Sequence, residues 1–358
     1  MGDAVRVFEA ISAFVGYGFC CSHAAEFART VYQSAWLKAH HPAHYLVAFL
    51  SCQPAGFFPP HVVLEEAKQL GIPVLGVDVN RSQDRFAVER VGSPPGRWAI
   101  RIGLAQVAQV GEALAEAIVW ERRRDRLVRG DDVPERPFTS LAELCQRLRP
   151  AGLSWAAAQA LVLSGACDGL RPRMERRQRL WQLHELWPLM GTLPSDRTRR
   201  RKAPAETEPI EQLAITWEVD ELTLAPPPPL PALDREERSA LDYQLLGLSA
   251  RPHPMGLLRR KLQRSGVRAL ADLAALPEGR FTRVAGWAIS AQAPPTARGM
   301  GFLVLEDETA RLPVALPPPL AAELHRVIRG SRVVAVAGRV ERVRWYRSLL
   351  AYELQAVR

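Results

Sequence analysis

The sequence predicts an α+β chain of several domains, with helices over most of the first 280 residues and a small five-stranded β-barrel at the C-terminal end. Three observations predict this. Apolar residues recur at helical spacing from Ser22 to His40 and again around Val62–Leu70. A basic, proline-rich stretch interrupts the helical pattern between about Thr192 and Pro231. After residue 280 the apolar period becomes two, which is typical of short strands.

The composition is that of a globular protein with several cores. The chain has 358 residues, 47% of them hydrophobic, and a mean hydropathy of −0.10. No run approaches the roughly 18 apolar residues of a membrane span, and the first residues do not form a secretory signal. The five cysteines form no C-x-x-C pair, which indicates reduced thiols. We therefore expect a cytoplasmic protein with no membrane partner.

Positive charge is concentrated in two blocks. Residues 121–202 contain 18 Lys and Arg against 10 Asp and Glu, a net of +8, and residues 281–358 contain 11 against 6, a net of +5. The two remaining segments are slightly acidic, and the whole chain has a net charge of +9. This pattern favours two surfaces that face an anionic polymer, and a solvated basic surface remains the alternative.

The predicted helices and turns follow in order. Ser22 is a plausible N-cap of the first helix, whose apolar stripe contains Phe27 and Val31, and Pro42 stops it. The second helix ends at Gly71. A short strand over Ile72–Val79, a turn over Ser93–Gly96 and short helices from Trp98 to Leu170 come next.

The C-terminal half begins with a linker that contains the basic run Arg197–Lys202 and the four prolines Pro226–Pro229. Leu233–Leu276 returns to helix. The strands that follow are predicted over Phe281–Ser290, Phe302–Glu308, Arg311–Leu316, Arg332–Glu341 and Ser348–Val357, with a helix over Leu320–Ile328. Five strands with one helix between the third and fourth are the layout of an OB-fold barrel, and another small barrel remains the alternative.

The most distinctive motif lies near the start. In Phe14–Phe19, two glycines flank Tyr17, and Ser22 and His23 follow at the start of the predicted helix. Glycines let the backbone turn tightly, and a helix N-terminus offers free N–H groups to a phosphate. A loop that packs under a helix would give the same pattern.

The motif resembles the fingers segment of the bacterial DNA polymerase III alpha subunit family, the C-family DNA polymerases. Ser51–Phe58, Pro73–Ser82 and Thr296–Gly299, which leads into Phe302–Thr309, resemble the error-prone branch of that family in particular. The resemblance runs over Phe8–Arg101, patchily to Leu170, and again over Leu233–Val357.

By that resemblance, the residues that face the incoming nucleotide are Gly16, Tyr17, Gly18, Ser22, His23 and Lys38, with Tyr32, Gln33 and Trp36 on the supporting helix. Replicative members have Asn-Lys before Ser-His, where this chain has Cys20-Cys21. The substitution removes a lysine that could contact phosphate, which weakens the expectation of efficient nucleotide binding.

Residues 101–123 resemble a helix-hairpin-helix, a motif that directs backbone N–H groups at a DNA phosphate. Ala108-Gln109-Val110-Gly111 stands where the family has Lys-Gly-Val-Gly. We expect DNA contacts at Val110, Gly111 and the run Arg122, Arg123 and Arg124. A second, degenerate copy is predicted over Leu153–Leu170, and small helices retained for packing are the alternative.

In the barrel, the expected nucleic-acid contacts are Arg283, Trp287, Arg298, Phe302 and Arg344, and Tyr346, Arg342 and Arg347 lie near strand ends or loops. Alternate residues of a small barrel are mostly core, so burial is the competing expectation for each aromatic residue. A weak match to a sliding-clamp peptide lies at Gln212–Trp217.

The resemblance also implies what a separate chain would have to supply. The palm aspartates that hold Mg²⁺ for nucleotidyl transfer, and the PHP domain, have no counterpart in this sequence, so no catalytic or metal-ligating residue is predicted. We expect the chain to be the DNA-binding portion of an error-prone polymerase that acts in replication and repair of damaged DNA. It should bind single-stranded and primer–template DNA, and it should need a palm-bearing partner chain for catalysis. A stand-alone OB-fold DNA-binding protein and a decaying polymerase fragment are the alternatives. The predicted parts are polymerase fingers (1–95), tandem helix-hairpin-helix region (96–190), linker (191–232), helical connector (233–280) and OB-fold (281–358).

Overall fold

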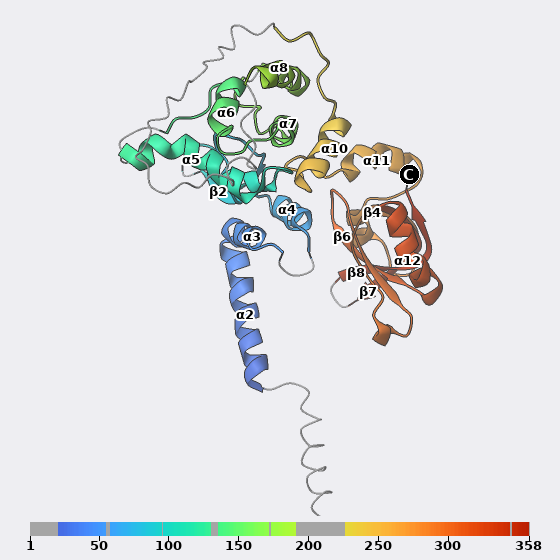
Figure 1. The fold of residues 1–358 in the computed structure, drawn as a ribbon. Coiled ribbons are helices and arrows are strands. Elements are labelled where there is room, and N and C mark those ends of the chain that lie inside the picture. Colours follow the sequence, from blue (N-terminus) through green and yellow to red (C-terminus); the bar gives the residue numbers. More distant parts are fainter. Residues whose placement is uncertain are drawn as a thin grey trace, which may run out of the picture.

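The computed structural model describes residues 21–54, 58–94, 96–129, 135–171, 173–190, 226–343 and 346–357, and not the side chains of 125–129. Figure 1 shows three regions: a helix that extends as a rod (α2), a body of helices with a small sheet, and a barrel. The linker run Arg197–Lys202 and the segment Gln212–Trp217 lie outside the described residues.

The helices are α2 (Cys21–His40), α3 (Pro42–Ser51), α4 (Pro60–Gln69), α5 (Gly111–Arg129), α6 (Leu141–Leu148), α7 (Trp155–Ser164), α8 (Arg176–Leu189), α10 (Arg235–Leu246), α11 (Met255–Arg264) and α12 (Pro318–Gly330), with short 3₁₀ turns η1 (Leu104–Gln106), η3 (Leu270–Ala275) and η4 (Pro295–Ala297). The strands are β1 (Val74–Leu75), β2 (Ala87–Val91), β3 (Arg97–Arg101), β4 (Phe281–Gln292), β5 (Gly301–Glu306), β6 (Arg311–Leu316), β7 (Val333–Val343) and β8 (Tyr346–Ala356). No helix in the described ranges is long and apolar enough to cross a membrane.

The body has one hydrophobic core, formed by α3 to α8 around a three-stranded sheet. The sheet order is β1-β3-β2, with β1 parallel and β2 antiparallel to β3. Of the strand expected over Ile72–Val79, only Val74–Leu75 is a strand (β1), and the turn expected over Ser93–Gly96 lies between β2 and β3. Strands β2 and β3 were not predicted from the sequence, because each is only five residues long and contains charged residues.

Local capping explains where several body helices begin and end. Ser140 and Ser154 precede α6 and α7 and accept hydrogen bonds from the backbone N–H groups three residues later. Gly71 follows α4 with a φ of +73°, as the sequence predicts. Ser22, in contrast, lies inside α2 instead of capping it.

The C-terminal region is a closed five-stranded barrel with strand order β4-β5-β6-β8-β7. Only β6 and β8 pair in parallel, and α12 lies between β6 and β7 in the chain. This is the architecture of an OB-fold, and the predicted fold class is confirmed. The predicted strand ends differ from the observed ones by at most two residues, because alternation along a half-buried strand is a local and regular pattern.

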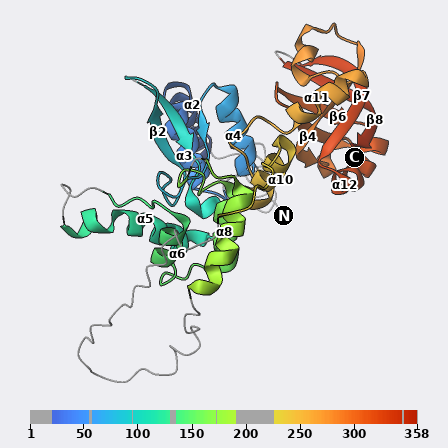
Figure 2. The same cartoon turned by 90° about the horizontal axis from the view of Figure 1, so that it is seen from above.

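The barrel lies beside the body, next to α10 (Figure 2), and charged and aromatic side chains join the two. Arg311 of β6 donates to the backbone O of Val62 in α4 at 2.6 Å and to Glu306 at 2.6 Å. Trp287 of β4 stacks on Tyr243 of α10, with ring centroids 5.1 Å apart. The contacts of Arg311 with Val62 and of Trp287 with Tyr243 fix the barrel beside α4 and α10.

Candidate nucleic-acid interface

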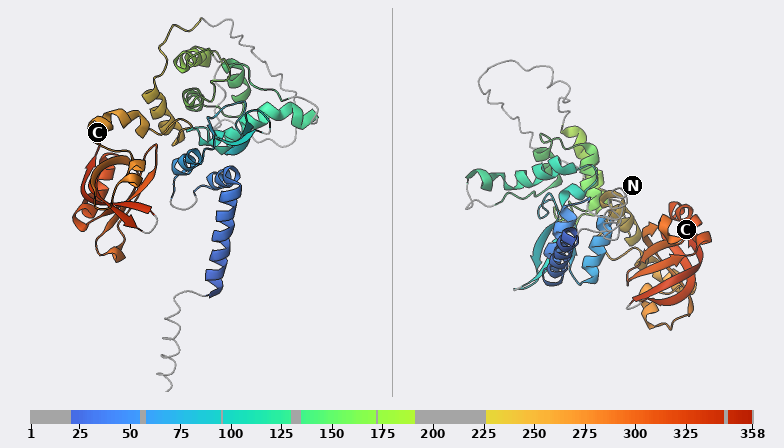
Figure 3. Two further views of the ribbon diagram at one scale, coloured as in Figure 1. Left: turned by 180° about the vertical axis from the view of Figure 1, so that it is seen from behind. Right: turned by 90° about the horizontal axis from the view of Figure 1, so that it is seen from below.

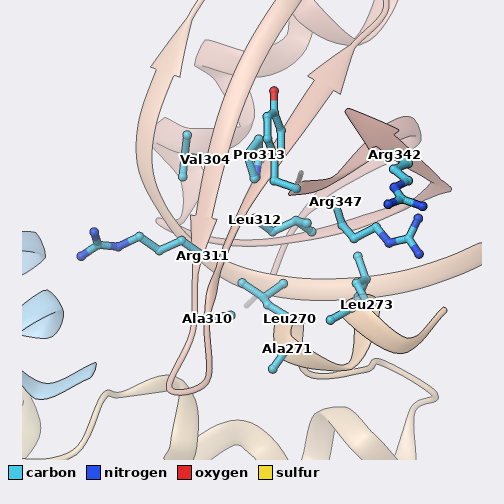
Figure 4. Close-up of a pocket in the computed structure, with 12 residues that line it drawn as sticks. Leu270, Ala271, Leu273, Val304, Ala310, Arg311, Leu312, Pro313, Arg342 and Arg347 are labelled. Carbon is cyan, nitrogen blue, oxygen red and sulfur yellow. The ribbon is translucent and has the colours of Figure 1, made fainter. Parts of the chain in front are cut away.

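A cleft of about 630 Å³ opens on the barrel, where β5, β6 and the start of β8 meet η3 (Figure 4). Its walls are apolar at Val304, Leu312 and Pro313. OB-folds bind oligonucleotides on the face of their second and third strands, between the first and fourth inter-strand loops. The second and third strands here are β5 and β6, which supply Val304, Leu312 and Pro313 to the cleft, so the cleft lies on part of this face.

Two arginines form one side of this cleft. Arg342 and Arg347 are directly paired in the β7–β8 register, and Figure 4 shows their guanidinium groups close together. Among the described residues, neither forms an ion pair with a carboxylate, and Arg342 is exposed. Adjacent guanidinium groups of this kind match the geometry of a phosphate. Arg311 lines the same cleft, but its side chain turns away toward α4.

The structure places the predicted barrel contacts in three different settings. Arg298 is exposed in the loop between β4 and β5, with a φ of +51°, and Phe302 is exposed at the start of β5. Arg283 is exposed and lies 3.4 Å from Glu353. Trp287 lies in the aromatic contact with Tyr243 instead of on the open surface, and Arg344 lies outside the described residues. Arg298 and Phe302 thus flank the open face, and Trp287 belongs to the junction.

The predicted hairpin lies between η1 and α5. Gln109 and Gly111 both have positive φ angles, +68° and +64°. Val110 is buried, and its backbone N–H donates to the carbonyl of Val107 at 3.1 Å, whereas Gly111 is exposed at the start of α5. The backbone N–H of Ala108 donates to the carbonyl of Leu245, so the end of α10 supports the hairpin. The tight turn is therefore kept although one family glycine is replaced by Gln109.

A second helix-turn-helix unit follows. Its turn lies between α6 and α7, at Gly152 with a φ of +91°, and α7 then ends at Gly165. The predicted second copy, Leu153–Leu170, therefore contains the second helix of this unit and begins just after its turn.

The arginine run Arg122–Arg124, expected directly after a helix, lies inside α5 and is not a uniform basic surface. Arg122 is only 1% exposed and donates to the carbonyls of Val79 at 3.0 Å and Ser82 at 3.1 Å. Burial lowers the pKa of its guanidinium group, and the nearby Glu135 partly offsets that effect. A buried guanidinium group with these hydrogen bonds stabilises the body, and it is not accessible to DNA.

Its two neighbours lie nearer to solvent. Arg123 donates to Glu135 at 3.0 Å, and Arg124 lies 3.7 Å from Glu121 and over the ring of Trp120. Both are therefore engaged in surface ion pairs, which cost little to rearrange when a phosphate approaches.

The nucleotide-facing residues of the sequence prediction are only partly described. Gly16, Tyr17 and Gly18 lie outside the described residues, and Ser22 and His23 are exposed in the first turn of α2. Lys38, near the other end of α2, forms an ion pair with Glu66 of α4. The structure therefore does not bring Lys38 together with Ser22 and His23. Among the described residues, no three His, Cys, Asp or Glu side chains gather as metal ligands do.

Replacing Gln109 by glycine is expected to stabilise the body, and replacing Gly111 by alanine is expected to destabilise it by about 1 kcal/mol. A left-handed backbone conformation costs a residue with a Cβ about 1–2 kcal/mol, and glycine does not have this cost. Glycine also raises the conformational entropy of the unfolded chain, which offsets part of the difference in stability. No atom lies within 4 Å of a Cβ added at Gly111, so backbone strain alone separates the two variants. Urea unfolding followed by circular dichroism measures both; an equal loss of stability in the two variants contradicts the expectation.

Comparisons with known proteins give one family model and many relatives. A model described as a helix-hairpin-helix motif matches residues 71–179. The chain is 36% identical over 352 residues to an error-prone DNA polymerase of Anaeromyxobacter sp. (strain K), covering 95% of this chain and 27% of that protein. Error-prone DNA polymerases of Teredinibacter turnerae and Pseudomonas syringae pv. tomato are each 34% identical, over 95% and 98% of this chain. The chain spans only about 27–30% of the length of these three relatives.

Two solved structures each resemble a segment of the chain. The S. pombe Stn1–Ten1 complex matches 22% of this chain at 22% identity, and a small single-stranded DNA-binding protein from Mycoplasma pneumoniae matches 22% at 10% identity. The TM-score is 0.19 in both cases. Likenesses at this level do not bear on function.

Proposed function

Because the chain is homologous to a C-terminal part of the error-prone DNA polymerases, we propose that it binds DNA as that part of a polymerase and depends on a separate palm-bearing chain for nucleotidyl transfer. The main support is the barrel cleft with Arg342 and Arg347, which form no ion pair with any described residue, together with the helix-hairpin-helix segment. Single-stranded DNA would lie on the barrel, and the hairpins would hold the backbone of the primer–template duplex.

Helix α2 supports the proposed dependence on a palm-bearing chain. It has 20 residues and none of them is buried, although it presents large apolar side chains. The exposed ones are Phe27, Val31, Tyr32, Trp36 and Leu37. Figures 1 and 3 show α2 extending away from the body, joined to it only at the α3 end. An apolar surface of this size calls for a partner, and the partner we propose is the chain that contains the palm and, with it, the Mg²⁺ ligands.

The direct test is a primer-extension assay on the purified chain with primer–template DNA, nucleotides and Mg²⁺. We expect binding without extension. Adding a palm-bearing polymerase chain from the same organism should give extension, and Val31→Glu in α2 should weaken that complex while leaving DNA binding unchanged.

The possible outcomes separate the parts of the proposal. Extension by the chain alone would contradict the need for a palm-bearing partner. DNA binding with no effect of Val31→Glu on any complex would favour a stand-alone DNA-binding protein. Docking of residues Gln212–Trp217 on a sliding clamp and cytoplasmic localisation remain further predictions of the same proposal.

A further inference from the structure

A pair of exposed aromatic side chains lies on the barrel outside the cleft. Phe281 at the start of β4 and Tyr352 in β8 are each 53% exposed, and their ring centroids are 6.3 Å apart at an interplanar angle of 47°. Two large aromatic side chains with this much exposure at adjacent positions are uncommon on a surface with no partner. Neither residue belongs to the cleft or to the junction with the body.

A β-bulge opposite Tyr352 determines which residues of β8 face outward. The β7–β8 register shifts between Ala337 and Gly338, so Tyr352 and Glu353 are both exposed between the buried residues Ala351 and Leu354. A Cβ added at Gly338 would lie 2.2 Å from the carbonyl oxygen of Leu350, so only glycine fits there. Bulges of this kind redirect side chains and often lie beside binding sites.

The strand register connects this pair to the open face of the barrel. Phe281 pairs with Arg339, and Arg339 pairs with Leu350. Leu350 pairs with Ala315, and Ala315 with Phe302. All five side chains are exposed or half-buried, whereas their chain neighbours Leu303, Val314, Leu349 and Val340 are buried. The five therefore form one outward row around the barrel, about 19 Å long at the usual strand spacing.

The charge of this surface suits an anionic strand. Arg280 and Arg339 are exposed beside the aromatic pair, and within the described residues Arg339 forms no ion pair. Arg283 is bonded to Glu353, and two more carboxylates belong to the adjoining segments: Glu278 in the preceding turn and Glu341, two residues after Arg339 on β7. Aromatic rings that stack bases, alternating with arginines that hold phosphates, are the usual features of single-strand binding.

We propose that Phe281 and Tyr352 form a second base-stacking platform, which extends the path of single-stranded DNA from Phe302 through Arg339 to the far side of the barrel. This inference rests on the proposed DNA binding and adds the direction in which the strand leaves the cleft. A short oligonucleotide fills the cleft alone, and a longer one also reaches the platform.

The test is fluorescence anisotropy with oligo-dT of increasing length, from 4 to about 16 nucleotides, the range of site sizes of an OB-fold. For the unchanged chain, affinity should rise with length. In the double variant Phe281→Ala, Tyr352→Ala this rise should be lost, with about tenfold or greater weakening for the longest oligonucleotide and no change for the shortest. Because both side chains are exposed, circular dichroism should show an unchanged fold.

A second variant separates stacking from charge. Arg339→Gln should reduce the slope of log affinity against log salt by about 0.7 for long oligonucleotides and should leave the slope unchanged for the shortest one. Ultraviolet cross-linking of a 5-bromouracil-substituted long oligonucleotide should label peptides that contain Phe281 or Tyr352.

Each contrary result has a distinct meaning. No binding of any oligonucleotide by the unchanged chain overturns the proposed function itself. Normal binding by the double variant at every length overturns the platform and leaves the proposed function standing. Equal weakening at all lengths shows that the pair belongs to the cleft, and self-association lost only in the double variant shows that it is a protein contact; either result overturns the extended path.

Discussion

Replacing Asp307 by alanine is expected to destabilise the barrel by about 3–5 kcal/mol, the cost of removing one partner from a buried charge pair. Asp307 is 1% exposed in the turn between β5 and β6. One carboxylate oxygen accepts from the backbone N–H groups of Thr309 and Ala310 and from the Thr309 hydroxyl, at 2.6–3.0 Å. The other accepts from Arg259 at 2.6 Å and from the backbone N–H of Leu270 at 2.9 Å. Alanine would leave the buried backbone N–H of Leu270 without its acceptor and would remove one of the two carboxylates that hold Arg259, the other being Glu308.

Hydrogen exchange measures this effect locally. In Asp307→Ala, amides of β5 and β6 should exchange at least a hundredfold faster, while those of α7 in the body should not change. The matched control is Glu353→Ala, because Glu353 is an exposed carboxylate of the same barrel with one 3.4 Å contact to Arg283, and its removal should cost less than about 0.5 kcal/mol. Similar exchange in the two variants would show that the Asp307 contacts do not stabilise the barrel.

Replacing Arg342 and Arg347 by alanine is expected to weaken binding of short oligo-dT by about a hundredfold. Each lost hydrogen bond to a charged group costs about 1.5–3 kcal/mol, which is at least tenfold in affinity. Two lost phosphate contacts should also lower the salt slope by about 1.4. Fluorescence anisotropy at several salt concentrations measures both quantities.

The control removes the same charge from another part of the barrel. Arg326 and Arg329 are exposed on α12, and Arg326 pairs with Glu323 on the same helix. The double variant Arg326→Ala, Arg329→Ala has the same net charge as the cleft variant and should bind nearly as well as the unchanged chain. Equal weakening in both would mean that general charge, and not the cleft, attracts DNA.

The parts of the fold that the sequence predicts are those with a regular local pattern. Strand β6 alternates strictly between core and surface, and the other barrel strands alternate over part of their length, so the strand ends and the position of α12 follow from the sequence to within two residues. Gly71 and Pro42 likewise mark helix ends by local backbone chemistry. Asp307 and Glu308, predicted as the end of the strand Phe302–Glu308, lie in the turn after β5, which ends at Glu306.

Burial of polar and aromatic groups depends on contacts between distant segments, and there the sequence is a weaker guide. Arg122 looks like a surface arginine, and only the carbonyls of Val79 and Ser82, some 40 residues earlier, make its burial possible. Trp287 follows the outward phase of β4, but α10 supplies Tyr243 to cover it. The row from Phe302 to Phe281 needs the register of four strand pairs, which no local pattern gives.

The most direct test of the central claim is fluorescence anisotropy of the purified chain with single-stranded and primer–template DNA, titrated with salt. The account predicts binding to both, with affinity that falls steeply as salt rises, because the contacts are mainly arginine to phosphate. Absence of binding at low salt would contradict the claim that this chain is the DNA-binding part of a polymerase.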